Sequence, residues 1–410
     1  MSPTARGLAQ DRFFQHFLAY MQAQGLSAEQ MHAHVWKPHH PHDLKVLGAD
    51  RDRDFKAIEL SESDVRAQLA SLSPGGFCIN GDFYRDDRTV YVLVPGFTHE
   101  TLRNLSLHEV FDDRQSSHDV LMLRPGIDGQ PTQEEWRAKG GGLKLVYAQY
   151  PRSNADSLVI GQPLFELLHN SATLRRWVVV EGCRIVFLGY SYGCPLTLEL
   201  LANLNRGTFA DNFILKATKA VVAMCGAIGG SYLADDVLKP DPQLLSIPKL
   251  VARCQKQPWL SALAGMPTQQ FRDDMVGGVT SLTREVRHER AMDYAPHLPA
   301  HVHYFTLSAV MPMMDYRRHW WQFNLDDYSM WLQAKVSEGV CIYNDGQVVT
   351  LDNLMPKESA VPENHIHHLG AVRGHHWAVS YRTFNFGRNR FPRKALYKAM
   401  LHTLVELTDA

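Results

Sequence analysis

The serine at position 191 lies in the sequence G-Y-S-Y-G, residues 189–193, and is the first candidate for chemistry. The apolar residues 184–188 before it predict a buried strand, and residues 195–201 after it predict the start of a helix. A G-x-S-x-G sequence between a strand and a helix is typical of a nucleophile elbow, a tight turn that exposes the serine hydroxyl. We therefore predict that Ser191 is a nucleophile.

A serine hydroxyl needs a base to accept its proton, and the base needs an acid to orient it. In the chain order expected for this arrangement, the acid and then the histidine follow the serine. Asp345 is the preferred acid because an apolar run, residues 340–343, ends there in an Asn-Asp-Gly turn. If that run is a strand, the turn lies at its carboxyl end, where sites of open α/β sheets are found. The alternatives are Asp315, which ranks second, and Asp326, Asp327 and Asp352.

The preferred base is His376, in a predicted loop that precedes the C-terminal segment. His375 is the alternative, because the side chains of two adjacent residues point in different directions and only one can reach Ser191. Three further histidines nearby, His365, His367 and His368, are interpreted as loop residues in solvent rather than as metal ligands.

An acyl-transfer site also needs two backbone N–H donors for the oxyanion of its tetrahedral intermediate. One is expected from Tyr192, which follows the nucleophile, and the other from the loop after an early strand. Phe97 is the candidate in that loop, where the preceding Gly96 would permit close approach of backbone and substrate.

Together these segments resemble the α/β-hydrolase family and, within it, the lipase/esterase group. The resemblance rests on residues 92–97, 189–193 and 343–346 and on His376-Trp377, with residues 225–231 similar to a segment of lipase-like members. It spans about residues 88–405 and implies that Ser191 is the nucleophile, Asp345 the acid and His376 the base, with Phe97 and Tyr192 as oxyanion donors. Pro95 stands where lipases usually have histidine, which argues against the lipase subtype more than against the chemistry.

The elements that would position these residues form an α/β pattern from about residue 76 onward. Strands are predicted at residues 90–94, 119–123, 143–147, 184–188, 220–224, 302–307 and 340–343, and helices at 156–169 and 393–407. The alternation predicts an α/β-hydrolase fold with a mostly parallel central sheet and helices on both faces. Three parts are expected: an N-terminal, mostly helical appendage (1–75), the core (76–225 and 302–410) and a helical lid insertion (226–301). Within the appendage, the spacing of Phe13, Phe17 and Met21 predicts an amphipathic helix at residues 8–24.

Composition excludes several classes of protein. The 410 residues carry a formal net charge of −1, and no lysine- and arginine-rich block indicates a nucleic-acid partner. The six cysteines are scattered, which argues against a disulfide framework. No signal sequence or long apolar segment is found, so we expect a cytoplasmic protein. No nucleotide-binding motif occurs and the histidines at 39, 40 and 42 lack a structured metal-ligand spacing, so no cofactor and no metal are expected.

The sequence therefore predicts a serine hydrolase that cleaves a carboxylic ester or thioester through an acyl-serine intermediate. Its partner would be a small-molecule acyl substrate, with an acyl-carrier protein as a further possibility. The alternative is an acyltransferase, or a biosynthetic thioesterase or cyclase, that uses the same triad with an acceptor other than water. A third, less favoured, hypothesis is a non-catalytic binding protein on a hydrolase scaffold.

Overall fold

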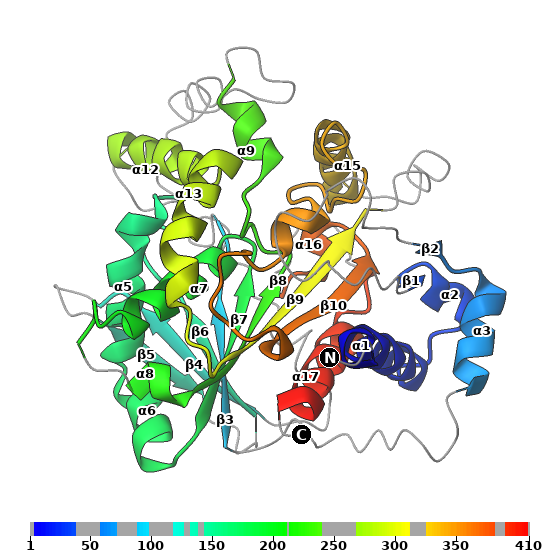
Figure 1. Cartoon of the computed structure of the whole chain (residues 1–410), viewed down its shortest axis with the longest axis horizontal. Helices are drawn as coiled ribbons and strands as arrows, with labels where there is room; N and C mark the ends of the chain where they lie inside the picture. Colours follow the sequence, from blue (N-terminus) through cyan, green and yellow to red (C-terminus); the bar gives the residue numbers. More distant parts are fainter. Residues whose placement is uncertain are drawn as a thin grey trace.

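The structure is a computed structural model with one large sheet between two layers of helices (Figure 1). It describes residues 4–37, 58–71, 88–97, 118–126, 132–137, 143–210, 213–239, 268–311, 325–381 and 390–408. Within these residues, no helix is both long enough and apolar enough to cross a bilayer.

The central sheet has eight strands in the order β10-β9-β8-β7-β3-β6-β4-β5. The strands are β3 (Thr89–Val94), β4 (His118–Arg124), β5 (Gln133–Arg137), β6 (Leu143–Ala148), β7 (Arg184–Tyr190), β8 (Thr218–Met224), β9 (His303–Val310) and β10 (Ile366–Arg373). All neighbours pair in parallel except β5, which is antiparallel to β4 at one edge. A separate two-stranded sheet joins β1 (Trp36–Lys37) and β2 (Ile58–Glu59).

Helices cover both faces of the sheet, as predicted (Figure 1). Those of the described residues are α1 (Thr4–Ala23), α2 (Ala28–His32), α3 (Glu62–Ser71), α5 (Ser157–His169), α6 (Ala172–Arg175), α7 (Gly193–Asn205), α8 (Phe213–Ala217), α9 (Tyr232–Val237), α12 (Thr268–Ser281), α13 (Arg284–Tyr294), α15 (Leu325–Ser337), α16 (His376–Val379) and α17 (Arg393–Thr408). The mostly parallel sheet between helical layers confirms the predicted α/β class.

Strand β3 shows why the sheet needs two helical layers, because every one of its residues is buried. Successive side chains of a strand point to opposite faces. Accordingly, Val90 and Val92 join a hydrophobic cluster with α5 and α7, whereas Tyr91 and Leu93 join a second cluster with α1 and α17. A continuous apolar run is therefore the sequence signature of such a strand.

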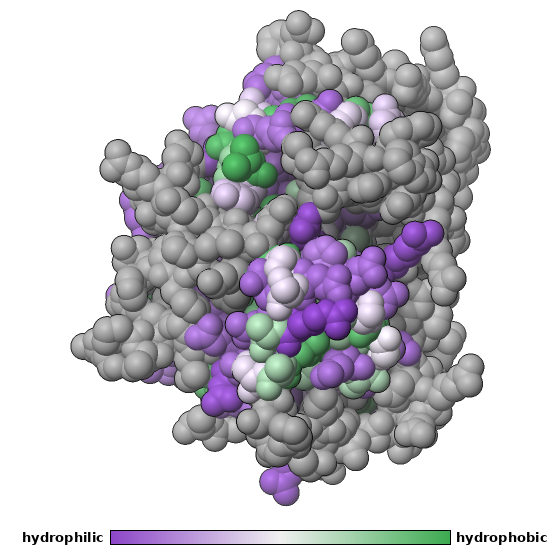
Figure 2. All heavy atoms as spheres, turned by 90° about the vertical axis from the view of Figure 1, so that its right-hand side faces the viewer, coloured by the Kyte–Doolittle hydropathy of each residue, from purple (hydrophilic) through white to green (hydrophobic). Residues whose placement is uncertain are grey.

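The first helix is part of this packing. Phe13, Phe17, Leu18 and Met21 of α1 are buried in the second cluster, which confirms the helical spacing predicted for residues 8–24. α1 and α17 lie side by side (Figure 1). The face seen in Figure 2 is mostly hydrophilic where it is coloured, with small apolar patches between. The division into appendage, core and lid stays a prediction.

The strand predicted at residues 340–343 is wrong. These residues are irregular, the side chain of Ile342 is 62 % exposed, and only an isolated bridge joins Asn344 to Val349. β10 occupies the position beside β9 instead. Its histidine-rich sequence conceals a strand, so the interpretation of His367 and His368 as loop residues is wrong as well. His368 is buried, and its Nδ1 lies 2.9 Å from the Thr306 hydroxyl.

The other predicted strands are confirmed, with ends that differ by at most three residues, and β5 was not predicted. The helices at 156–169 and 393–407 are confirmed as α5 and α17.

In the segment 226–301 the structure describes α9, α12 and α13, and residues 240–267 lie outside the described residues. The histidines at 39, 40 and 42 and the second-ranked acid, Asp315, also lie outside them. Of the described cysteines, Cys194 and Cys225 are buried free thiols.

Candidate active site

Ser191 lies in a tight turn between β7 and α7 with a φ of +55°, a left-handed conformation that non-glycine residues rarely adopt. The flanking glycines make this turn possible. A Cβ on Gly193 would lie 2.1 Å from the Val94 carbonyl oxygen, and one on Gly189 would lie 2.9 Å from the Cα of Cys194. The Ser191 N–H donates to the Met224 carbonyl at 3.1 Å, which fixes the turn to the end of β8. The strained turn is the geometry that a nucleophile elbow requires.

The loop after β3 approaches this serine closely. A Cβ on Gly96 would lie 2.7 Å from the Ser191 Cβ and 3.3 Å from its Oγ, so only glycine fits there. The Tyr150 hydroxyl donates to the Pro95 carbonyl at 2.5 Å and holds the loop in place. The rings of Phe97 and Tyr192 meet edge to face with their centroids 6.0 Å apart. The two residues predicted as oxyanion donors are therefore neighbours.

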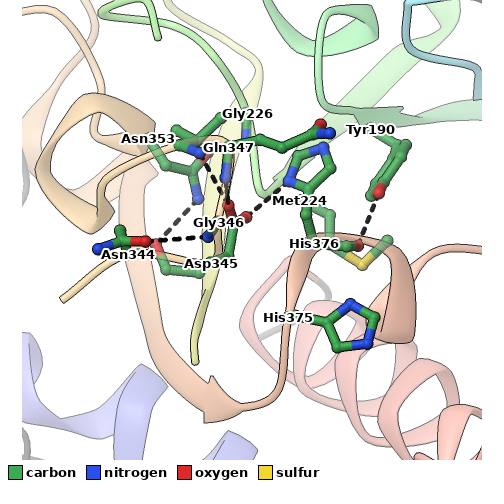
Figure 3. A network of polar contacts seen from close by, with 12 residues as sticks. Tyr190, Met224, Gly226, Asn344, Asp345, Gly346, Gln347, Asn353, His375 and His376 are labelled. Carbon is green, nitrogen blue, oxygen red and sulfur yellow. Dashed lines mark hydrogen bonds and ion pairs between the residues drawn. The ribbon is translucent and has the colours of Figure 1, made fainter. Parts of the chain in front are cut away.

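Asp345 and His376 form a buried pair (Figure 3). The His376 Nδ1 lies 2.7 Å from the Asp345 Oδ2. The other carboxylate oxygen, Oδ1, accepts from the backbone N–H groups of Gln347 at 2.9 Å and Val348 at 2.8 Å. The His376 N–H also donates to the Asp345 carbonyl at 2.8 Å. These contacts fix the carboxylate and direct it at one nitrogen of the imidazole.

A backbone hydrogen bond after β9 holds Asp345 near His376, although the strand predicted at residues 340–343 is absent. The Met311 N–H, directly after β9, donates to the Asn344 carbonyl at 2.8 Å. After α15 the chain therefore comes back to the carboxyl end of β9. Asp345 lies at this strand end, where the sites of open α/β sheets are found.

His375 points away from Asp345 (Figure 3). Its Nε2 lies 2.9 Å from the Asp327 carboxylate on α15, and its Nδ1 accepts from the Ala378 N–H at 3.1 Å. Asp352, another alternative acid, lies 3.0 Å from the Arg284 guanidinium. Burial raises the Asp352 pKa to about 7, against the opposing effect of Arg284. The structure brings His376 together with Asp345 and gives Asp327 and Asp352 other partners; the side chain of Asp326 lies outside the described residues.

The sequence interpretation missed two residues that surround the pair. The Tyr190 hydroxyl donates to the His376 carbonyl at 2.6 Å, and the two rings lie 4.9 Å apart. The Cys225 Sγ lies within 4.8 Å of a carboxylate oxygen of Asp345 and of a ring nitrogen of His376, and burial raises the pKa of the thiol well above its usual range, so it stays protonated. Both residues lie at carboxyl ends of central strands, and this position was the signal that could have found them.

Within the described residues, Cys225, Asp345 and His376 offer ligand atoms that all lie within 4.8 Å of one another. The buried Nε2 of His376 makes no hydrogen bond to any residue that the structure describes. This nitrogen can accept a proton from a group that approaches it, because Asp345 already occupies Nδ1.

Helix α12 lies against the predicted oxyanion residues. A Cβ on Gly278 would lie 2.7 Å from the Phe97 ring and 2.1 Å from the Asn154 carbonyl oxygen, so the helix needs glycine to come this close. The Tyr192 hydroxyl and the Ser281 Oγ lie 2.8 Å apart. Asp274 of the same helix forms an ion pair with Arg152 at 2.5 Å. α12 is thus in contact with Phe97, with Tyr192 and with residues 152–154.

Comparison with known proteins identifies the fold. No protein-family profile and no curated protein matches the sequence. Among solved structures, the metagenomic carboxyl esterase MGS0156 is similar, with 19 % identity and a TM-score of 0.53 over 99 % of this chain and 97 % of that one. Bacillus licheniformis lipase BlEst2 in mature form gives 14 % identity and a TM-score of 0.40, over 78 % of this chain and 93 % of the lipase. Lipase 1 from Pelosinus fermentans gives 11 % and 0.40, over 79 % and 99 %.

The parallel sheet, its helical layers and the similarity to the carboxyl esterase along nearly the whole chain show that this protein has the α/β-hydrolase fold. Since a fold hosts many activities, the function has to be argued from the site.

Proposed function

We propose that the protein is a serine hydrolase that cleaves a carboxylic ester or thioester. The observation that carries the proposal is the buried pair of His376 and Asp345, with an Nδ1 to Oδ2 distance of 2.7 Å. The pair lies at the carboxyl ends of the parallel strands, as does the strained turn of Ser191. The similar solved structure is a carboxyl esterase, which favours a carboxylic ester as the substrate.

In the proposed reaction, the Ser191 Oγ attacks the acyl carbonyl carbon while its proton passes to the His376 Nε2. Asp345 keeps the proton of the imidazole on Nδ1 and stabilises the cation. The oxyanion of the tetrahedral intermediate accepts hydrogen bonds from the N–H groups of Phe97 and Tyr192. Collapse of the intermediate breaks the bond to the leaving group, which takes the proton from Nε2, and an acyl-serine remains.

Water then attacks the acyl-serine, gives a proton to the His376 Nε2 and forms the second tetrahedral intermediate. When this intermediate collapses, the bond to Oγ breaks, the carboxylic acid leaves and Ser191 recovers its proton. We also propose that the segment 226–301 acts as a lid, on the support of the contacts that α12 makes with Phe97 and Tyr192.

Replacement of Ser191 by alanine tests the proposal. Turnover of p-nitrophenyl esters and labelling by a fluorophosphonate probe should both disappear, while circular dichroism and thermal unfolding should match the wild-type protein. If ester turnover and labelling survive in Ser191→Ala, the triad assignment is wrong. Mass spectrometry of the trapped acyl-enzyme should locate the acyl group on Ser191.

The same acyl-serine could pass its acyl group to an alcohol, an amine or a carrier-bound acceptor. An acyl-chain-length series on esters and thioesters, with and without added alcohols, separates the two reactions. A hydrolase yields free acid as the main product, whereas a transferase yields the new ester at low acceptor concentration.

A further inference from the structure

The side chain of Tyr192 ends in a buried network of polar groups that the proposed reaction does not use. Tyr192 directly follows Ser191 and is the N-terminal capping residue of α7. Its hydroxyl lies 2.8 Å from the Ser281 Oγ, at the end of α12, and donates to the Ala155 carbonyl at 3.2 Å. Tyr192 and Ser281 are both fully buried, so bulk water does not compete for these hydrogen bonds.

The numbers of donors and acceptors determine the direction of every hydrogen bond around Ser281. A serine hydroxyl accepts two hydrogen bonds and donates one. The Ser281 Oγ accepts from the Arg290 guanidinium at 2.9 Å and from the Ser157 N–H at 3.3 Å. Its own proton therefore goes to the Tyr192 oxygen, and the Tyr192 proton goes to the Ala155 carbonyl. Burial raises the pKa of the Tyr192 hydroxyl above its usual range, so this proton is present.

Arg290 of α13 is held in place at the start of this chain of hydrogen bonds. Its Nη2 donates to the two carboxylate oxygens of Asp156 at 2.8 Å and 2.7 Å, and its Nη1 contacts the Ser157 hydroxyl as well as Ser281. Asp156 is itself the capping residue of α5 and accepts from the Leu158 N–H at 2.8 Å. Because two nitrogens of the guanidinium have partners, the donor that reaches Ser281 has a defined position.

The same face of α12 supports the other residue assigned to the oxyanion. Gly278 and Ser281 are three residues apart, so they are neighbours on one face of the helix. Gly278 permits the helix to approach the Phe97 ring, which meets the Tyr192 ring edge to face with centroids 6.0 Å apart. The side chains of both residues whose N–H groups are assigned to the oxyanion therefore pack against α12.

We propose that Ser281 and Arg290 are positioning residues, which direct the backbone N–H of Tyr192 at the oxyanion. This inference rests on the proposed function, because it concerns the oxyanion donors of that site. Such a donor has to lie about 2.7–3.1 Å from the oxyanion, and catalytic groups have to be held to within about 0.5 Å. The rigid Tyr192 ring joins the hydroxyl to the backbone that carries the N–H, so loss of the partners of the hydroxyl should change the position of that N–H. Ser281 is fully buried and acts through Tyr192 rather than by contact with the substrate.

Kinetics of Ser281→Ala with a p-nitrophenyl ester test this role. Loss of a whole oxyanion donor costs about 10²- to 10³-fold in kcat in a serine protease. A displaced donor should cost less, so we expect kcat to fall by about 10- to 100-fold, with KM within about twofold of the wild-type value. The affinity for a trifluoromethyl ketone, whose adduct with Ser191 carries an oxyanion, should fall by the same factor as kcat/KM.

Arg290→Met gives a second test at a position that is less buried than Ser281. The side chain of Arg290 is 17 % exposed, and methionine keeps most of its length but removes the donors to Ser281 and Asp156. We expect a loss of kcat in the same range as in Ser281→Ala, again with little change in KM. Thermal unfolding of both variants checks that the fold is intact.

A double-mutant cycle with Tyr192→Phe distinguishes positioning through the hydroxyl from a general loss of packing. Tyr192→Phe removes the group through which Ser281 acts, so Ser281→Ala should have little further effect on kcat in that background. Losses that multiply in the double variant would overturn the proposal, because Ser281 would then act by another route.

Arg206→Gln is the matched control. Arg206 also joins α7 to α13, through Asp293 at 3.1 Å, but it caps the opposite end of α7 from Tyr192. It should leave kcat within about twofold of the wild-type value. Unchanged kcat in both Ser281→Ala and Arg290→Met, or an equally large loss in Arg206→Gln, would overturn the proposal. Ester turnover that survives in Ser191→Ala would instead refute the proposed function, so the two failures are distinguishable.

Discussion

Replacement of Asp345 by asparagine should abolish most of the activity by reversing one hydrogen bond. The Oδ1 of Asp345 accepts two backbone N–H groups, from Gln347 and Val348. In Asp345→Asn the amide oxygen has to take this position, because an NH₂ group there would face two donors. The NH₂ group then points at the His376 Nδ1, which must become an acceptor. The proton of the neutral imidazole moves to Nε2, and this nitrogen can no longer accept a proton from Ser191.

The magnitude follows from this change of tautomer. In a serine protease with the same triad, the corresponding substitution lowers kcat by about 10⁴-fold. At about 1.36 kcal/mol for each factor of ten, this corresponds to about 5.4 kcal/mol of transition-state stabilisation. Since the His376 Nδ1 to Asp345 distance is 2.7 Å and both side chains are buried, we expect an effect of the same order here.

The assay measures kcat and KM with a p-nitrophenyl ester in the wild-type protein and in two matched variants. Asp327→Asn alters the neighbouring pair, in which Asp327 lies 2.9 Å from the His375 Nε2, and should leave kcat within about threefold of the wild-type value. Thermal unfolding of both variants checks that the fold is intact. Activity of Asp345→Asn above a tenth of the wild-type value would refute the reasoning. A larger loss in Asp327→Asn than in Asp345→Asn would transfer the role of base to His375.

Three further predictions concern packing, pH and the environment of the acid. Gly193→Ala should lower the free energy of unfolding in urea by about 3 kcal/mol, because its Cβ would lie 2.1 Å from a carbonyl oxygen of β3. Gly161→Ala in α5, where the Cβ meets nothing within 4 Å, should raise it by up to about 1 kcal/mol, and similar effects of the two would contradict the argument. Burial lowers the His368 pKa from 6.5 to about 4, so below pH 6.5 the unfolded chain binds a proton that the folded protein does not. Stability should therefore fall as the pH falls from 6.5 toward 4, by up to about 1.4 kcal/mol per pH unit for this residue, and His368→Gln should flatten the slope measured by urea unfolding. Cys225→Ala should lower kcat about tenfold through loss of a polar group within 4.8 Å of the Asp345 carboxylate, whereas Cys225→Ser should stay near the wild-type value; equal losses would show that packing alone matters.

Local patterns in the sequence were sufficient for the elbow and for most of the sheet. The turn at Ser191 depends on glycines and on the strand and helix next to it, all within about twenty residues. Buried parallel strands such as β3 and β8 are continuous apolar runs, because both of their faces are covered. β10 was not predicted because its histidines read as polar loop residues in the sequence, whereas in the structure His367 stacks on the rings of His303 and Phe305 of the neighbouring strand. A polar side chain can be covered in this way only by contacts that the strand's own sequence does not contain.

The chain's own sequence determined the α/β class, the elbow and the short set of aspartates and histidines that could complete a site. Which histidine faces which aspartate was decided by the tertiary structure, because the two adjacent side chains meet partners 31 and 48 residues away. The same holds for the hydrogen bonds of Ser281 with Tyr192 and Arg290, which join three different helices. The direction of a side chain follows from its backbone, and the backbone at these places is fixed by contacts between distant segments. The periodicity of apolar residues within one segment does not depend on such contacts and therefore cannot predict them.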